Sequence, residues 1–193
     1  MPTPKILVLP GSTRIGSHNV RLAALAAKEL TLLDVDVTRI SLADYPLPIY
    51  DADVDAGHGQ PEPAVRLKRM IASHHGVFIA SPDYSASVPP VLKNAIDWVS
   101  RVRERGDPTY AAFKGRIFAI ASASPEPNGG LPGLMALRQI LEAGCGALVI
   151  PEQVTVARAD QAFDDMDRLT DTRTANLFHA QLARLVEMTR LLA

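Results

Sequence analysis

The chain places short apolar runs between longer stretches of helical periodicity, and this alternation limits the folds that it can adopt. Five runs, of which only the second alternates with polar residues, are predicted as strands at residues 6–9, 35–40, 77–80, 117–121 and 147–150. Helices are predicted near residues 19–33, 62–73, 89–102, 131–143 and 172–192. Continuous apolar strands are typical of a parallel sheet that is buried on both faces. The strand–helix alternation therefore predicts an α/β fold, a doubly wound parallel sheet with helices on both faces and right-handed crossovers.

Length and composition limit how many domains the chain can form and which classes of partner it can bind. The 193 residues fit a single domain that spans residues 1–193. The 20 basic and 21 acidic side chains leave a net charge of −1, whereas nucleic-acid binders usually carry a clustered basic surplus. One cysteine rules out a disulfide framework and suits a reducing compartment. Since no export signal or membrane-spanning run is visible, we expect a cytoplasmic protein that binds neither nucleic acid nor membrane.

Polar residues crowd the segment after the first predicted strand, which reads GSTRIGSHN from Gly11 to Asn19. A helix N-terminus exposes free N–H groups and the positive end of the helix dipole, which together suit a phosphate. Ser12, Ser17 and Asn19 add short polar side chains, and Arg14 adds a charged fork. The motif lacks the glycine spacing of a Rossmann fingerprint and the Gly-Lys-Ser/Thr of a Walker A loop, which favours a mononucleotide. The alternative is that Ser17 or Asn19 only caps the helix.

Two further loops follow the third and fourth predicted strands, at residues 81–89 and 122–130. The first of them holds Tyr84, whose ring can pack against a planar heterocycle, between two stiffening prolines. The second holds adjacent glycines, which let the backbone approach a ligand closely. Each loop alone is a weak signal, because turns generally favour such residues. Three of them at the carboxyl ends of parallel strands are a stronger signal, since ligands bind at that edge.

Taken in order, the segments GSTRIGSHN, SPDYSASVPPVLKNAIDWVSR and SASPEPNGG with the later LRQIL resemble the NAD(P)H-dependent FMN reductases of flavodoxin-like fold. The quinone and chromate reductase branch of that family also shows a stretch similar to LPIYDADV in this chain. The resemblance covers about residues 5–150. It implies a five-stranded sheet in the order 2-1-3-4-5, FMN as the bound cofactor, and NADPH or NADH as the co-substrate.

The resemblance also implies roles for individual residues. The FMN phosphate would be held by Ser12, Arg14, Ser17 and Asn19. The ribityl chain and one side of the isoalloxazine would be lined by Pro82, Asp83, Tyr84 and Ser85. The third loop would border the ring through Ser122, Ser124, Gly129 and Gly130. Asp83 and Ser85 depart from the family's usual Pro-Glu-Tyr-Asn, and the third loop has an apparent insertion with two prolines, so the electron acceptor stays open.

These features lead to the hypothesis of an oxidoreductase that uses FMN and NAD(P)H to reduce quinones, free flavin or similar small acceptors in a ping-pong cycle. No side chain is assigned a catalytic role, because the flavin carries the chemistry. No metal site is expected, since the histidines lack ligand spacing and the aspartates at 164–171 lack the glycine and glutamate of a calcium loop. The alternatives are a flavodoxin-like electron carrier or flavin-binding sensor without small-substrate turnover, and a phosphate-binding module without flavin.

The helix at 89–102 also predicts an interface between copies of the chain. Its apolar residues span an arc of about 160°, wider than the roughly 100° that covers a sheet. Trp98, the only tryptophan in the chain, lies at the edge of this arc. We therefore expect a homodimer or homotetramer in which Trp98 meets a neighbouring copy. The alternative is that the terminal helix or the loop at 103–115 covers Trp98 within one subunit.

Overall fold

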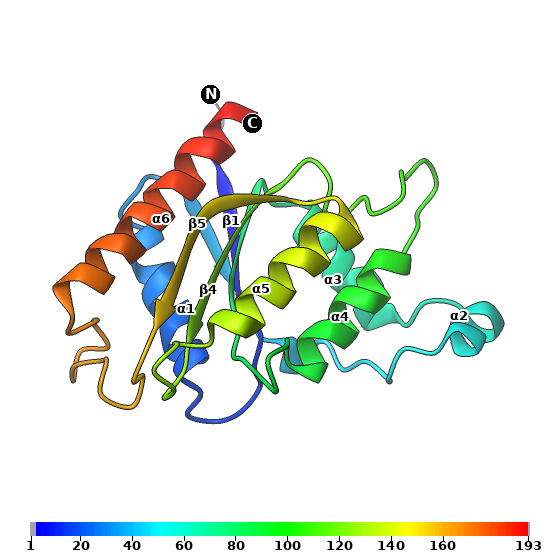
Figure 1. Cartoon of the computed structure of the whole chain (residues 1–193). Helices are drawn as coiled ribbons and strands as arrows, with labels where there is room; N and C mark the ends of the chain where they lie inside the picture. The colour runs from blue at the N-terminus through cyan, green and yellow to red at the C-terminus, as the bar shows by residue number, and fades with distance from the viewer. Residues whose placement is uncertain (1–2, 193) are drawn as a thin grey trace.

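The computed structural model describes residues 3–192, and its centre is a sheet of five parallel strands (Figure 1). The strands are β1 (Lys5–Pro10), β2 (Asp36–Arg39), β3 (Gly76–Ala80), β4 (Ile117–Ala123) and β5 (Leu148–Val156). They lie in the order β2-β1-β3-β4-β5, and every neighbouring pair is parallel. The predicted fold class and strand order are therefore confirmed.

Helices cover both faces of the sheet (Figure 1). On one face lie α1 (His18–Leu30) and α6 (Thr172–Leu192). The other face carries α3 (Glu62–Ala72), α4 (Pro90–Arg101) and α5 (Leu131–Gln139), which continues as a π-helical turn at Ile140–Gly144. Two short elements have no predicted counterpart, the 3-10 turn Leu42–Asp44 and α2 (Ala52–His58), which buries no residue and projects from the body. Within residues 3–192, no helix is both long and apolar enough to span a membrane.

The strand β5 continues past its predicted end at residue 150 and reaches Val156. A bulge in its pairing with β4 interrupts the apolar run, which is why the sequence pattern stops early. Two side chains bond carbonyl groups at this bulge: Arg138 donates to the oxygen of Ile150 (2.9 Å), and Gln181 donates to that of Glu152 (3.0 Å). The strand therefore resumes beyond the bulge, and its carboxyl end lies beside that of β4.

Trp98 of α4 is fully buried inside the subunit, so the expectation that it meets a neighbouring copy is wrong. Its indole N–H donates to the carbonyl oxygen of Pro48 (2.8 Å), and the ring of Tyr50 packs edge-on against it at a centroid distance of 5.0 Å. Asn94 holds the same segment, because its side chain bonds the Pro48 carbonyl (2.9 Å) and the Tyr50 N–H (2.8 Å). The wide apolar arc of α4 therefore covers the sheet and the segment before α2, and neither predicted cover is the observed one.

The loop at residues 103–115 joins the end of α4 to the start of β4, at the sheet edge opposite the three predicted ligand loops (Figure 1). Lys68 of α3 fastens it through ion pairs with Glu104 (2.6 Å) and Asp107 (2.5 Å). Hydrogen bonds from Arg69 and Lys68 lower the pKa of Glu104 to about 2. This loop is therefore an anchored structural connection.

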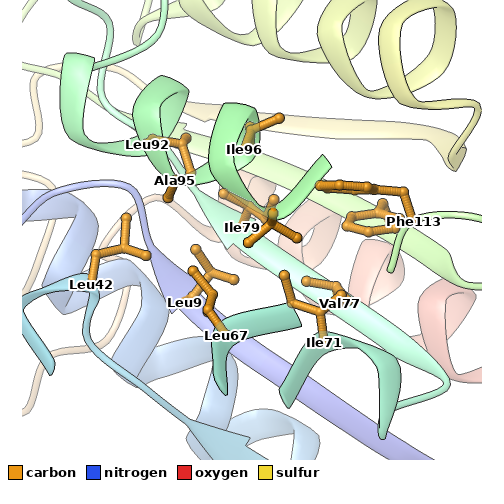
Figure 2. Close-up of a pocket in the computed structure, with 12 residues that line it drawn as sticks. Leu9, Leu42, Leu67, Ile71, Val77, Ile79, Leu92, Ala95, Ile96 and Phe113 are labelled. Carbon is orange, nitrogen blue, oxygen red and sulfur yellow. The ribbon is translucent and has the colours of Figure 1, made fainter. Parts of the chain in front are cut away.

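A small cavity remains between the sheet and the helices α3 and α4 (Figure 2). Its volume is about 20 Å³, and its walls are apolar side chains that include Val77, Ile79, Leu67, Ile71 and Ala95. No polar group lines the cavity, so a water molecule in it would have no hydrogen-bond partner. The side chains around the cavity also lack packing contacts across it.

The cavity predicts an unusual response to a larger side chain. Val77→Ile adds one methylene group that the cavity can hold, so we expect the free energy of unfolding to rise by about 0.5–1 kcal/mol in urea titrations. Val8→Ile is the matched control, because Val8 is fully buried in the core on the opposite face and does not line the cavity. Overpacking there is expected to cost about 1–3 kcal/mol. A loss of stability in both variants would contradict the interpretation of this space as a packing defect.

Candidate functional site

The three predicted loops meet at the carboxyl edge of the sheet, at the bottom of the view in Figure 1. Together they line an open cleft of about 130 Å³. The cleft is lined by Ser12, Arg14, Ser17, His18, Asn19, Pro82, Asp83, Tyr84, Ala123, Ser124 and Pro125. Eight of the twelve predicted site residues are thus brought together, while Ser85, Ser122, Gly129 and Gly130 do not line the cleft.

The first loop turns into α1 so that the N-terminus of this helix opens into the cleft. Gly16 adopts a left-handed φ of 72°, which lets the chain turn immediately before the helix. Ser17 is the N-cap, and its hydroxyl oxygen accepts a hydrogen bond from the N–H of Asn19 (3.3 Å). The first turn of α1 contains no acidic side chain, so nothing on the helix neutralises the positive end of its dipole. Ser17 therefore caps the helix, as the alternative held, and still has a hydroxyl hydrogen to donate.

Arg14 lies on the rim of the cleft and forms no ion pair with a carboxylate in the described part of the chain. Its guanidinium makes a single weak contact, with the carbonyl oxygen of Ile15 (3.3 Å). Ser12 supports the turn from below, because its hydroxyl oxygen accepts from the N–H of Arg14 (3.2 Å). An uncompensated guanidinium beside a helix N-terminus is suited to an anion.

Asn19 is almost fully buried and uses its side chain to join the first loop to the third. Its amide group donates to the carbonyl oxygen of Ala123 (2.8 Å), and its oxygen accepts from the Ala123 N–H (3.0 Å). Both hydrogen-bonding groups of the side chain are therefore engaged by the end of β4. The structure makes Asn19 a positioning residue, whereas the resemblance implies direct contact with a phosphate.

The second loop is held in place by Asp83, whose carboxylate accepts from the N–H groups of Ala86 (2.9 Å) and Gly133 (2.8 Å). Gly133 lies in the first turn of α5, and a Cβ on it would approach the Asp83 Cα to 2.9 Å. Tyr84 keeps 46% of its surface exposed beside the cleft, which leaves its ring available to a ligand. Ser85 sits at the turn of this loop, with a φ of 52°.

The third loop contributes Ser124 to the cleft, while its other predicted residues lie beneath. Ser122 is fully buried, and its hydroxyl oxygen has no hydrogen-bond partner. Gly130 packs directly over it, and a Cβ on Gly130 would overlap that oxygen. Gly129 packs against β5, where an added Cβ would come within 2.8 Å of the Thr155 Cβ. These three residues shape the loop through close packing.

Among the residues of the site that the sequence-based predictions omit are His18, Ala123 and Pro125, which line the cleft, and Gly133, which packs against the second loop. His18 lines the cleft between two predicted residues, although nothing in its spacing distinguishes it from a surface histidine. Gly133 permits the close approach of α5 to the second loop. A glycine in the first turn of a predicted helix was the available signal for it, since glycine weakens helices and needs a reason there.

Known proteins similar to this chain include FMN reductases and quinone reductases. The model of the NADPH-dependent FMN reductase family matches residues 4–161. An NAD(P)H-dependent FMN reductase of Pseudomonas aeruginosa is 34% identical over 182 residues, which cover 94% of this chain and 92% of the relative. A quinone reductase of Escherichia coli K12 is 36% identical over 138 residues, 71% of this chain and 69% of the relative. The solved structure of a flavoenzyme NAD(P)H:(acceptor) oxidoreductase from Paracoccus denitrificans superposes with a TM-score of 0.79 at 27% identity, covering 98% of each chain.

The bond between Asn19 and Ala123 predicts a specific loss of stability. Asn19→Ala leaves a buried N–H and a buried carbonyl without partners, so we expect the free energy of unfolding to fall by about 2–4 kcal/mol. Asn94→Ala is the matched control, because it also removes two side-chain hydrogen bonds to backbone but at a more exposed position. Urea unfolding of both variants makes the comparison. An equal or smaller loss in Asn19→Ala would contradict the positioning role.

Proposed function

The chain belongs to the NADPH-dependent FMN reductase family, and we propose that the cleft at the carboxyl edge of its sheet is where FMN binds. The protein is an FMN-dependent NAD(P)H oxidoreductase that acts on quinones or flavins. The observation that supports the proposed location is that three features meet in one cleft: a helix N-terminus with no acidic residue in its first turn, a half-exposed Tyr84, and an Arg14 that forms no ion pair within residues 3–192.

The donor set in the cleft fits the phosphate of FMN. Ser12 and Ser17 offer hydroxyl groups and Arg14 offers a guanidinium. The N–H of His18, the first residue of α1, makes no hydrogen bond within residues 3–192 and is also available. Asp83 also lines the cleft, and its carboxylate accepts hydrogen bonds from two backbone N–H groups. These bonds reduce the repulsion between the carboxylate and a bound phosphate. Asn19 would act on the phosphate indirectly, by fixing the first loop to β4.

The second and third loops would hold the rest of the cofactor. We assign the ribityl chain and one side of the ring to Pro82, Asp83, Tyr84 and Ser85. The opposite border is assigned to Ser124 at the surface, with Ser122, Gly129 and Gly130 supporting the loop from within. In this assignment Ser122 acts only through the shape of the loop, since it is fully buried.

When bound, FMN supplies the redox chemistry, a hydride taken from NAD(P)H and electrons passed to the acceptor. The side chains of the cleft bind and orient, and none of them is required as a nucleophile. A nicotinamide and a quinone are both flat rings that need the same open side of the cleft, so we propose that they occupy it in turn. Quinones are the proposed acceptors because several relatives are named quinone reductases. A cytoplasmic location stays a proposal from the single cysteine, which suits a reducing compartment.

A steady-state assay tests this function. We expect the protein reconstituted with FMN to oxidise NADPH or NADH in the presence of p-benzoquinone, and double-reciprocal plots at several quinone concentrations to give parallel lines, because the two substrates share one place. Flavin-free protein and free FMN are the controls. Oxidation no faster than that with free FMN would contradict the proposed activity, and intersecting lines would contradict the shared place.

We also propose that the protein forms a homodimer, or a homotetramer built from such dimers. Ile49 is 88% exposed and lies between Pro48 and Tyr50, both of which are bonded to Asn94 of α4. Val91, one turn before Asn94 and also exposed, extends this apolar strip toward the second loop. A contact through the strip replaces the one proposed through Trp98 and would place a neighbouring copy near the cleft.

Light scattering tests the assembly. The expected wild-type mass is two or four times 20.8 kDa, and Ile49→Glu is expected to lower it toward 20.8 kDa, because the charge would be buried in the contact. Leu32→Glu is the matched control, since Leu32 is 78% exposed and lies outside the strip. A wild-type mass of 20.8 kDa, or an equal effect of both substitutions, would contradict the proposed contact.

A further inference from the structure

A second groove opens at the carboxyl edge of the sheet, on the other side of the first loop from the cleft. Its volume is about 410 Å³, and it shares Ser12 and Arg14 with the cleft. The strand order explains this placement, because β1 lies between β2 and β3. The first loop, which follows β1, therefore has the cleft on its β3 side and the groove on its β2 side. The second wall of the groove is formed by residues 39–44, from the end of β2 to the end of the 3-10 turn.

Two arginines line this groove, one on each wall. Arg14 belongs to the first loop, and Arg39 is the last residue of β2. Neither guanidinium forms an ion pair with a carboxylate within residues 3–192, and the Arg39 side chain makes no hydrogen bond to any of these residues. Asp44, the one acidic residue that lines the groove, is likewise outside every ion pair of the described chain. Two guanidinium groups that no carboxylate neutralises favour an anion between them, and their forked donors match the oxygens of a phosphate.

The groove also offers hydroxyl groups and an apolar surface. The hydroxyl oxygen of Ser41 accepts from the N–H of Ala43 (3.2 Å), so its hydrogen stays available to donate, and the hydroxyl group of Thr13 is exposed. Ile15 is 97% exposed on the wall of the groove, where a flat base can pack against it. The carboxylate of Asp44 can accept from a ribose hydroxyl or an amino group. This chemistry suits a nucleotide that carries a phosphate monoester.

The co-substrate of the reaction contains such a nucleotide. NAD(P)H joins its nicotinamide to an adenosine through two riboses and a pyrophosphate, and NADPH carries a phosphate monoester on the 2′ oxygen of the adenosine. With the nicotinamide over the flavin ring in the cleft, this chain of groups can cross the first loop and bring the adenosine to the groove. NADH has a hydroxyl group in place of the 2′-phosphate, so only NADPH would bring an anion to Arg39.

We propose that this groove binds the 2′-phosphate end of NADPH, and that Arg39 makes the protein prefer NADPH to NADH. The inference rests on the proposed function, because it assumes that the nicotinamide is oxidised at the cleft. Arg14 lies between the two sites, and the several N–H donors of its guanidinium can face a phosphate on either side. Arg39 lines only the groove, so its contribution to NADPH binding can be separated from the binding of FMN.

Calorimetry with nucleotide fragments tests the groove without turnover. Protein saturated with FMN is titrated with adenosine 2′,5′-bisphosphate, and separately with ADP, which also has two phosphates but none on the 2′ oxygen. We expect the bisphosphate to bind about tenfold more tightly, because only its 2′-phosphate meets Arg39. Arg39→Gln should abolish this preference. Arg105→Gln is the matched control and should keep it, since Arg105 is an exposed arginine in the loop at the opposite edge of the sheet. Equal binding of the two ligands by wild type, or a preference that survives Arg39→Gln, would overturn the proposal.

Steady-state kinetics at saturating FMN give a second measurement. We expect the ratio of kcat/KM for NADPH to that for NADH to fall about tenfold in Arg39→Gln and to stay at the wild-type value in Arg105→Gln. The fall should come from NADPH, because NADH has no 2′-phosphate to lose a contact.

The same assay separates failure of this inference from failure of the proposed function. If the wild-type protein loaded with FMN oxidises neither NADPH nor NADH, the proposed function fails. If it oxidises them and the kcat/KM ratio is the same in wild type and Arg39→Gln, the proposed function stands and the role of Arg39 is overturned.

Discussion

The parallel pairing of β1 with β3, and of β3 with β4, is the constraint on which the rest of the structure depends. Parallel pairing brings the carboxyl ends of these strands to one edge, so the loops that follow them must meet there. β1, β3 and β4 are also the strands whose residues are most completely buried, so their positions are fixed by the two apolar cores on either side. The cleft is therefore built on the most completely buried strands of the sheet.

Hydrogen bonds made by two side chains hold the first and second loops in place against the rest of the fold. Asn19 joins the first loop to the end of β4, and Asp83 joins the second loop to the start of α5. Both links bond a side chain to backbone, so they position whole segments of chain. Within residues 3–192 they leave Arg14 without an ion pair and His18 without a side-chain hydrogen bond. An enzyme whose redox chemistry belongs to its cofactor needs this division of labour, in which the protein supplies placement and charge.

Almost all of the fold can be predicted from the sequence, because continuous apolar strands and amphipathic helices are local patterns. The location of the cleft can also be predicted from the sequence, because three unusual loops follow strands that must end at one edge of the sheet. Which partner a side chain selects depends on contacts between distant segments. Asn19 and Ala123 are 104 positions apart, and Trp98 is covered by a segment 50 positions away, so no local pattern could show either contact. The apolar arc of α4 correctly indicates a second covering surface but says nothing of what supplies it.

The central claim is that FMN lies in this cleft with its phosphate at the N-terminus of α1. A crystal structure of the protein grown with FMN tests it most directly. We expect electron density for the phosphate within hydrogen-bonding distance of Ser12, Arg14 and Ser17, with the flavin ring beside Tyr84. Density for the flavin on another face of the protein, or for a phosphate that points away from α1, would contradict the account.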